Sequence, residues 1–546
     1  MTSVTRATTS YANALNERMN ASNRHYYNQE TVYNELANTV LNTDKDLVRE
    51  IMHEFDIHAP SNNDCMKIIT DSSKEYWQSD EVMADIKSLL VSMSPEQKCM
   101  FAYQMDLSAL CEYGGPTMRY FYDEIIRKVE PVTDKEEVET LFGSASENET
   151  SLTSVMNSDW IKGIGLSDLS DSQKEVWAAR LKVVKQTINK YSRLFEVFFS
   201  HGFMPANIHS LPTAVRKVVV GSDTDSTIYT TQRQVQWYTG SLKASSIALS
   251  VGAVTSFISS ELTSGVLAHM SANMGIDKHN LQTIVMKPEV ISMAQINTQK
   301  AKHYAMDKSI VEGDVYADED VELEIKGVGL RSSKFPKIIR EESAKFMKLS
   351  LKLPLLEQKL KPINMAAIIA KNEHYIGKAL SSGETTFLQT ERINKPEAYA
   401  SETDHHILAM HFWNMVFGNK YGIISELPTS TMKVAVKLEK KAKFQEWVKT
   451  LDIYQQKQVA RFVEIHGKNM FTNILIPPSA LENGVIKEII PVIDTRRMLG
   501  QLMKPFYTAS NGLNLNILNK NLTRFWSDEI SKEQAEENIP ELYHSM

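Results

Sequence analysis

Apolar residues recur regularly along the stretch 172–200. Their spacings alternate between three and four, which places them on one face of an α-helix. Ser172 and Glu175 match a capping box that predicts where this helix begins, and Gly202 predicts that it has ended. The apolar face comprises Trp177, Leu181, Val184, Ile188, Tyr191, Phe195 and Phe198. We expect one long helix whose apolar face contributes to a core.

Two short β-favouring runs lie on either side of a polar centre at 221–227. Residues 218–220 are all valine, and Ile-Tyr follows at 228–229. This pattern is typical of a β-hairpin with a tight turn. The turn carries Asp223 and Asp225, so we expect both carboxylates at the tip of the hairpin.

Helical patterns dominate the rest of the chain. They predict mostly helical structure over 1–130, where Asp106 is expected to belong to an ordinary helix, and a buried helix over 244–274. The acidic, Ser- and Glu-rich segment 131–151 is expected to be an exposed loop. The predicted fold class is α+β, mainly helical with an antiparallel sheet.

The composition is that of an ordinary globular protein, with 42% hydrophobic and 23% charged residues. A length of 546 residues is sufficient for roughly two to four domains. Three cysteines without Cys-x-x-Cys spacing indicate a reducing compartment. The N-terminus lacks an apolar signal core, and serines and threonines interrupt the longest uncharged run, so we expect a cytoplasmic protein without membrane contact.

The two aspartates of the expected turn define the candidate chemistry. Asp223 and Asp225 are close enough in sequence for their oxygens to hold hard cations such as Mg²⁺. Such a pair is the protein's part of a two-metal phosphoryl-transfer site. An alternative is open, because an apolar run followed by Asp-x-Asp-x-Thr also resembles the nucleophile motif of haloacid dehalogenase-type phosphatases. In that case Asp223 would form an aspartyl-phosphate.

Gly-Ser-Asp-Thr-Asp-Ser at 221–226 resembles motif C of the family B DNA polymerases, which is usually Tyr-Gly-Asp-Thr-Asp-Ser. The resemblance implies template-directed DNA synthesis, in which deoxynucleoside triphosphates donate nucleotides to a primer 3′ end. It further implies that Asp223 and Asp225 are catalytic and hold two Mg²⁺ ions, or Mn²⁺ in their place.

A segment before the hairpin is similar to one half of polymerase motif B, Lys-x-x-x-Asn-Ser-x-Tyr-Gly. Asn157 begins the run Asn-Ser-Asp-Trp and lies 66 residues before Asp223, a separation similar to the family's. Thr153 stands where the family has the lysine that grips the incoming triphosphate, and Lys162 is a candidate replacement. The resemblance implies nucleotide binding by Asn157 and Lys162.

Two later segments resemble the parts of the family that hold the primer and the duplex. Lys302 and Tyr304 keep their places in the Lys-Lys-Arg-Tyr primer segment, where the lysine meets a phosphate and the ring packs against a sugar or base. The passage 326–337 resembles the strand-to-thumb connection of the T4-type phage branch. Its candidate DNA-binding residues are Lys326, Arg331, Ser332, Ser333, Lys334 and Lys337.

Charge is distributed unevenly over the second half of the chain, although the net charge is only −7. Across 331–361 nine Lys or Arg accompany three Glu, a stripe that suits DNA phosphates or, alternatively, a solvated helix face. Residues 492–506 resemble the end of family B thumbs. The segment 527–546 is expected to be an acidic tail, and since family tails often dock a sliding clamp, a clamp is a candidate partner.

The matches occur in the family's order over 153–506, and this collinearity favours the polymerase over the phosphatase. The resemblance implies a largely helical fingers region over 1–210, an antiparallel palm sheet with the hairpin over 211–335, and a mixed, mostly helical thumb over 336–526.

The segment around Asp106 only faintly resembles motif A, and no exonuclease pattern is present. We therefore predict the C-terminal part of a split polymerase of the T4-type phage branch, acting inside an infected host cell. A second polypeptide would supply the exonuclease and motif A. A non-catalytic, DNA-binding replisome subunit is the remaining alternative.

Overall fold

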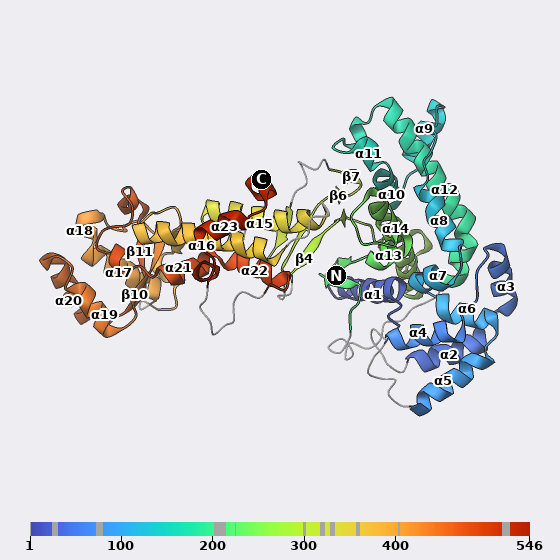
Figure 1. Cartoon of the computed structure of the whole chain (residues 1–546), viewed down its shortest axis with the longest axis horizontal. Coiled ribbons are helices and arrows are strands. Elements are labelled where there is room, and N and C mark those ends of the chain that lie inside the picture. Colours follow the sequence, from blue (N-terminus) through green and yellow to red (C-terminus); the bar gives the residue numbers. More distant parts are fainter. Residues whose placement is uncertain are drawn as a thin grey trace. The chain divides into compact units, whose positions relative to one another are not determined.

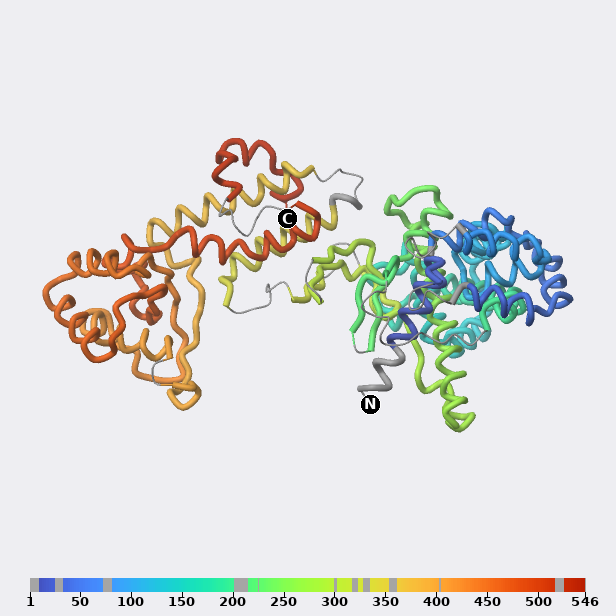
Figure 2. The backbone as a smooth tube through the Cα atoms, turned by 90° about the horizontal axis from the view of Figure 1, so that it is seen from below, coloured from blue at the N-terminus to red at the C-terminus, as the bar shows by residue number. Residues whose placement is uncertain are grey.

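The computed structural model describes residues 2–24, 31–72, 80–200, 215–223, 225–298, 302–316, 323–327, 334–355, 361–401, 404–515 and 525–545. The chain forms two compact units, whose elements are labelled in Figure 1. Unit 1 comprises Met1–Met293 and Asp307–Glu322, and unit 2 comprises Ala294–Met306 and Leu323–Met546. Neither unit is therefore one continuous segment. Figure 2 draws the path of the backbone.

The long helix predicted from the apolar spacing is α12 (Asp171–Phe199). Its stripe from Trp177 to Phe198 packs into the core of unit 1, which confirms the prediction. The predicted cap was wrong by two residues, because the main-chain N–H of Ser170 donates to Gln173 Oε1 at 3.0 Å. Gln173 thus performs at the third helical position the role that was assigned to Glu175.

The buried helix predicted over 244–274 is α14 (Ser246–Asn273). By length and composition it is the one described helix that could cross a membrane, with a mean hydropathy of 1.2 over its most apolar window. However, 61% of that window is buried inside the protein. α14 packs on α1 (Thr2–Ala21), α8 (Thr117–Ile126) and α10 (Glu147–Met156), as a core helix does.

The loop predicted over 131–151 was wrong, since this segment contains α9 (Lys135–Gly143) and the first half of α10. Asp134 caps α9 by accepting the main-chain N–H groups of Glu136 and Glu137. Ser146 and Glu149 form a capping box at the start of α10. The acidic residues therefore stabilise helix N-termini instead of marking an unstructured segment.

The remaining elements of unit 1 confirm the mostly helical prediction for its first part. Two small antiparallel sheets accompany the helices, one formed by β1 and β2 and the other in the order β3-β6-β7. The strands are β1 (Val219–Ser222), β2 (Thr227–Tyr229), β3 (Val290–Ile291), β6 (Ile310–Val311) and β7 (Asp314–Val315). The other helices are α2 (Thr31–Asn42), α3 (Lys45–Glu54), α4 (Asn62–Ser72), α5 (Asp80–Ser92), α6 (Pro95–Tyr103), α7 (Leu107–Tyr113), α11 (Ser158–Ile161), η1 (Leu166–Asp168), α13 (Gln232–Thr239) and η3 (Lys278–Asn280).

Unit 2 is built around two three-stranded sheets, in the orders β4-β5-β8 and β11-β10-β9. Aromatic side chains of α17, α19, α20 and β11 fill a core beside the second sheet. The strands are β4 (Gln295–Asn297), β5 (Tyr304–Asp307), β8 (Leu323–Lys326), β9 (Gln389–Ile393), β10 (Thr429–Leu438) and β11 (Phe471–Ile476). The helices up to Leu502 are α15 (Lys337–Leu355), α16 (Pro362–Ser382), η4 (Pro396–Ala398), α17 (His405–Val416), α18 (Gly418–Tyr421), α19 (Lys441–Val448), α20 (Ile453–His466), η5 (Pro478–Leu481), η6 (Ile490–Val492) and α21 (Thr495–Leu502).

The segment expected to be an acidic tail is folded into unit 2. After α22 (Lys504–Gly512), the chain forms η7 (Trp526–Asp528), α23 (Lys532–Asn538) and α24 (Glu541–Ser545). Ala535 and Tyr543 are buried, and these helices lie against α15 and α16 in both views (Figures 1 and 2). The tail was missed because its few apolar residues are widely spaced among acidic ones. Mainly helical units with small antiparallel sheets confirm the α+β class.

Candidate active site

The predicted hairpin is present and carries both aspartates at its tip. β1 and β2 pair antiparallel, with Ser222 opposite Thr227. The main-chain N–H of Asp223 donates to the carbonyl of Ser226 at 2.9 Å, which closes the turn. Asp223 and Asp225 are both exposed, and Thr224 between them lies outside the described residues. The two carboxylates therefore lie on the exposed side of a turn whose ends are joined by this hydrogen bond.

A buried carboxylate of α1 holds the base of this hairpin. Glu17 is 0% exposed, and its Oε1 accepts the main-chain N–H groups of Lys217, Val218 and Val219 at 3.0, 3.1 and 2.8 Å. Its Oε2 accepts from Lys217 N at 2.9 Å and from Asn23 Nδ2 at 2.7 Å. Three successive main-chain donors therefore converge on one carboxylate, as they do in an anion-binding nest.

Asn13, one helical turn before Glu17 on α1, contacts the hairpin nearer its tip. Asn13 Nδ2 donates to Ser222 Oγ at 3.2 Å, and Asn13 Oδ1 accepts from Thr227 Oγ1 at 2.5 Å. Residues four apart lie on the same face of a helix, so one face of α1 holds both strands.

Apolar contacts complete the attachment of the hairpin. Ala21 of α1 packs with Val218 and Val219, which are 5% and 3% exposed, and with Tyr229. The Tyr229 hydroxyl hydrogen-bonds to Ser256 and Ser259 of α14, and burial of that hydroxyl raises the pKa of Tyr229. The hairpin is therefore fixed to two helices of unit 1, while its turn faces solvent.

Asp106, the faint candidate for a motif A aspartate, is not available to a metal ion. Its side chain is fully buried and caps α7 by accepting the N–H of Ala109 at 2.9 Å. It also accepts from Ser22 Oγ at 2.9 Å and pairs with Arg24 at 3.2 Å. Burial raises the pKa of Asp106, and the Arg24 charge opposes that rise. These contacts support its assignment to an ordinary helix end.

The candidate nucleotide-binding residues lie in different surroundings. Asn157 ends α10, is 2% exposed, and donates through Nδ2 to the carbonyl of Thr153 at 3.1 Å. Its amide therefore does not face solvent in this structure. Lys162, after α11, is exposed. A role for either residue in nucleotide binding stays a prediction.

The candidate primer-binding residues belong to unit 2. Lys302 is exposed, and Tyr304 on β5 contacts Glu324 on β8 at 3.4 Å. Lys326 pairs with Glu324 at 3.4 Å and lies over the Tyr304 ring. The hydrogen bond with Tyr304 is the main cause that raises the pKa of Lys326, and Glu324 adds to it. A cation and an aromatic ring are thus held together on this sheet. Primer binding by this group stays a prediction.

Arg331, Ser332 and Ser333 lie outside the described residues. Lys334 pairs with Glu391 at 3.7 Å and Lys337 with Glu341 at 3.6 Å, both as largely exposed lysines. Part of the basic stripe belongs to α15, where Lys345 instead covers the ring of Tyr543 at 4.5 Å. At least one lysine of the stripe thus packs against the folded C-terminal segment.

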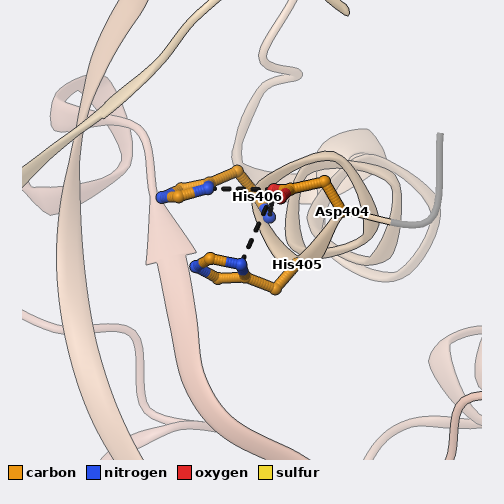
Figure 3. A group of neighbouring side chains, drawn as sticks. All are labelled: Asp404, His405 and His406. Atoms are coloured by element: carbon orange, nitrogen blue, oxygen red, sulfur yellow. Dashed lines mark hydrogen bonds and ion pairs between the residues drawn. The ribbon is translucent and has the colours of Figure 1, made fainter. Parts of the chain in front are cut away.

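A second polar group, which the sequence patterns did not indicate, lies at the start of α17. Potential ligand atoms of Asp404, His405 and His406 all lie within 4.8 Å of one another (Figure 3). Asp404 Oδ1 accepts the main-chain N–H of His406 at 2.8 Å and lies 3.0 Å from its Nδ1. The N–H of His406 is the main cause that lowers the pKa of Asp404. The positive end of the helix and the charge of Lys468 both oppose a cation here, so a helix cap accounts for this group.

The hairpin defines the class of site. Two exposed carboxylates on a short turn can supply oxygen ligands to hard divalent cations, which is what phosphoryl transfer to or from a nucleotide requires. Asp223 follows β1 directly, but both aspartates are exposed, and β1 belongs to a two-stranded antiparallel hairpin, whereas an aspartyl nucleophile lies at a buried strand end. An exposed hairpin tip therefore agrees better with the motif C resemblance than with the phosphatase alternative.

Comparison with known families identifies the chain more closely. It belongs to the divergent family B DNA polymerases, whose family model matches residues 1–530. A comparison with curated proteins finds no match. The sequence motifs covered 153–506 only, whereas the family match includes the helices of residues 1–152 as well. The match gives no support to the narrower T4-type assignment or to a C-terminal fragment.

Proposed function

We propose that this chain carries out template-directed DNA synthesis, with Asp223 and Asp225 as the carboxylates that hold two Mg²⁺ ions. When bound there, Mg²⁺ would supply the positive charge that stabilises the attacking and leaving oxygens of nucleotidyl transfer. The supporting observation is the hairpin tip, where two hard oxygen donors project from a backbone that α1 holds in place, in a chain that belongs to a DNA polymerase family.

The test is loss of each carboxylate. Asp223→Asn and Asp225→Asn should each abolish nucleotide incorporation while leaving duplex DNA binding largely intact, because the substitutions remove ligand charge and little volume. Asp314→Asn is the matched control, since Asp314 is also an exposed aspartate of a hairpin in unit 1. Near-normal extension by the Asp225 variant would overturn the proposal. Template binding without extension by the unsubstituted chain assembled with its second polypeptide would favour the non-catalytic subunit.

We also propose that a second polypeptide supplies the remaining metal carboxylate and pairs with the hairpin. Among the described residues, the sheet of β1 and β2 has two strands, so backbone groups remain at its edges. Asp106 is buried in an ion pair. Two carboxylates alone offer few protein oxygens to replace metal-bound water, which predicts weak Mg²⁺ binding.

The split arrangement is tested by purification from the native source and by co-expression. Because of these open sheet edges, we expect the chain expressed alone to be poorly soluble and inactive. A second polymerase-like chain should co-purify with this one, and its co-expression should restore solubility and primer extension together. Robust extension by this chain alone would contradict the split arrangement while leaving the roles of Asp223 and Asp225 intact.

A further inference from the structure

We infer that Glu17 is a positioning residue that sets the backbone geometry of the two catalytic carboxylates, an inference that rests on the proposed function. Glu17 does not reach the turn itself. It holds the chain at 217–219, from which β1 runs directly to Asp223. The link from α1 to the metal ligands is therefore one short strand.

The chemistry of the contact requires a carboxylate. Glu17 accepts hydrogen bonds from three main-chain N–H groups and from the Asn23 amide, and it donates none. In Glu17→Gln, an NH₂ donor would replace one of the two acceptor oxygens. At least one buried N–H would then lose its hydrogen-bond acceptor. The carboxylate charge also strengthens every one of these bonds.

The position of the Glu17 contact indicates a role beyond stabilising the fold. The register of the hairpin is irregular between Val219 and Gly221, directly beyond the residues that Glu17 holds. A bulge of this kind bends a strand and redirects its side chains. Because Glu17 fixes the strand on one side of the bulge and Asn13 binds Ser222 and Thr227 on the other, α1 determines where the strand points after the bend.

The direction of the strand is important because it places the ligands of Mg²⁺. It demands near-ideal octahedral geometry, so small displacements of Asp223 relative to Asp225 weaken its binding more than they weaken the binding of more tolerant cations. Partners that orient metal ligands typically contribute about 10–100-fold in metal affinity or activity. We expect Glu17 to lie in this range although it contacts neither metal nor substrate.

The experiment compares Glu17→Gln with Glu373→Gln. Glu373 is a matched control because it is 1% exposed in unit 2 and likewise accepts a main-chain N–H, that of Ser527 at 2.7 Å. Amide hydrogen exchange over 215–223 should accelerate in Glu17→Gln and not in Glu373→Gln. Mn²⁺ affinity, followed by electron paramagnetic resonance, should fall about 10-fold, and the ratio of Mn²⁺- to Mg²⁺-supported extension should rise.

The outcomes separate the two proposals. Unchanged exchange over 215–223 would overturn the anchoring role whatever the protein's activity, and faster exchange with unchanged cation affinity would reduce Glu17 to a structural residue. If neither cation binding nor extension depends on Asp225, the proposed function fails, while the exchange result still decides the anchor. Should Glu17→Gln not fold, Asn13→Ala removes only the contacts nearer the tip and should give the same changes at smaller amplitude.

Discussion

Replacement of Asp106 distinguishes a structural aspartate from a motif A aspartate. Asp106 has 0% exposure and three partners, namely the N–H of Ala109, Ser22 Oγ and Arg24. We expect Asp106→Asn and Asp106→Ala to lower stability without changing the intrinsic activity of the molecules that remain folded.

The magnitudes follow from these contacts. Removing one partner of a buried ion pair costs about 3–5 kcal/mol. Arg24 keeps Glu35 at 2.7 Å and the carbonyl of Ala102 at 2.6 Å, so we expect the lower end, about 3 kcal/mol, for Asp106→Ala. Asparagine still caps a helix, so Asp106→Asn should cost only about 1–2 kcal/mol. Both losses are smaller than the usual stability of a domain, about 5–15 kcal/mol.

The assay is urea denaturation followed by circular dichroism, combined with Mn²⁺ titration and primer extension at equal concentrations of folded protein. Asp225→Asn serves as the opposite control, because it should lose cation binding and extension with little change in stability. If Asp106→Asn abolished extension and left the denaturation midpoint unchanged, Asp106 would be a metal ligand and the burial argument would be refuted.

Two further predictions concern unit 2. Replacing several lysines of the 331–361 stripe by alanine should weaken duplex binding for all DNA sequences. In a filter-binding titration, the salt dependence of binding should become flatter by roughly one unit of slope for each DNA phosphate that the protein no longer neutralises. An unchanged slope would indicate a solvated helix face. Burial raises the pKa of Glu373 above its ordinary value of 4.5, so its stabilising contribution is complete below that value and is lost as pH rises through the raised pKa. Thermal unfolding should show a decline over this window that Glu373→Gln flattens, and an equal slope in both proteins would contradict the assignment.

Short-range patterns predicted the elements near the site well. The α12 stripe, the α14 helix and the hairpin with Asp223 and Asp225 each depend on residues close in sequence, and each is present. The two helices that begin in 131–151 were not predicted, because the acidic composition indicated a loop. The caps at Asp134 and Ser146, which begin these helices, were the signal that was overlooked.

Long-range partners could not be predicted from the same patterns. Glu17 lies in an ordinary helical sequence, and nothing in its neighbours indicates that Lys217 is its partner 200 positions later. The folded C-terminal segment was missed for a similar reason, since Ala535 and Tyr543 are buried only by contact with α15 and α16.

The separation between Glu17 and β1 also has a consequence for synthesis of the chain. At about 5–20 residues per second, α1 leaves the ribosome roughly 10–40 s before its hairpin partner. During this interval the Glu17 carboxylate lacks its three main-chain partners, and the contact with them is of the non-local kind that slows folding. The aspartates can acquire their final geometry only after the nascent chain has passed β2, so a ribosome stalled before that point would display α1 without the strands that it holds.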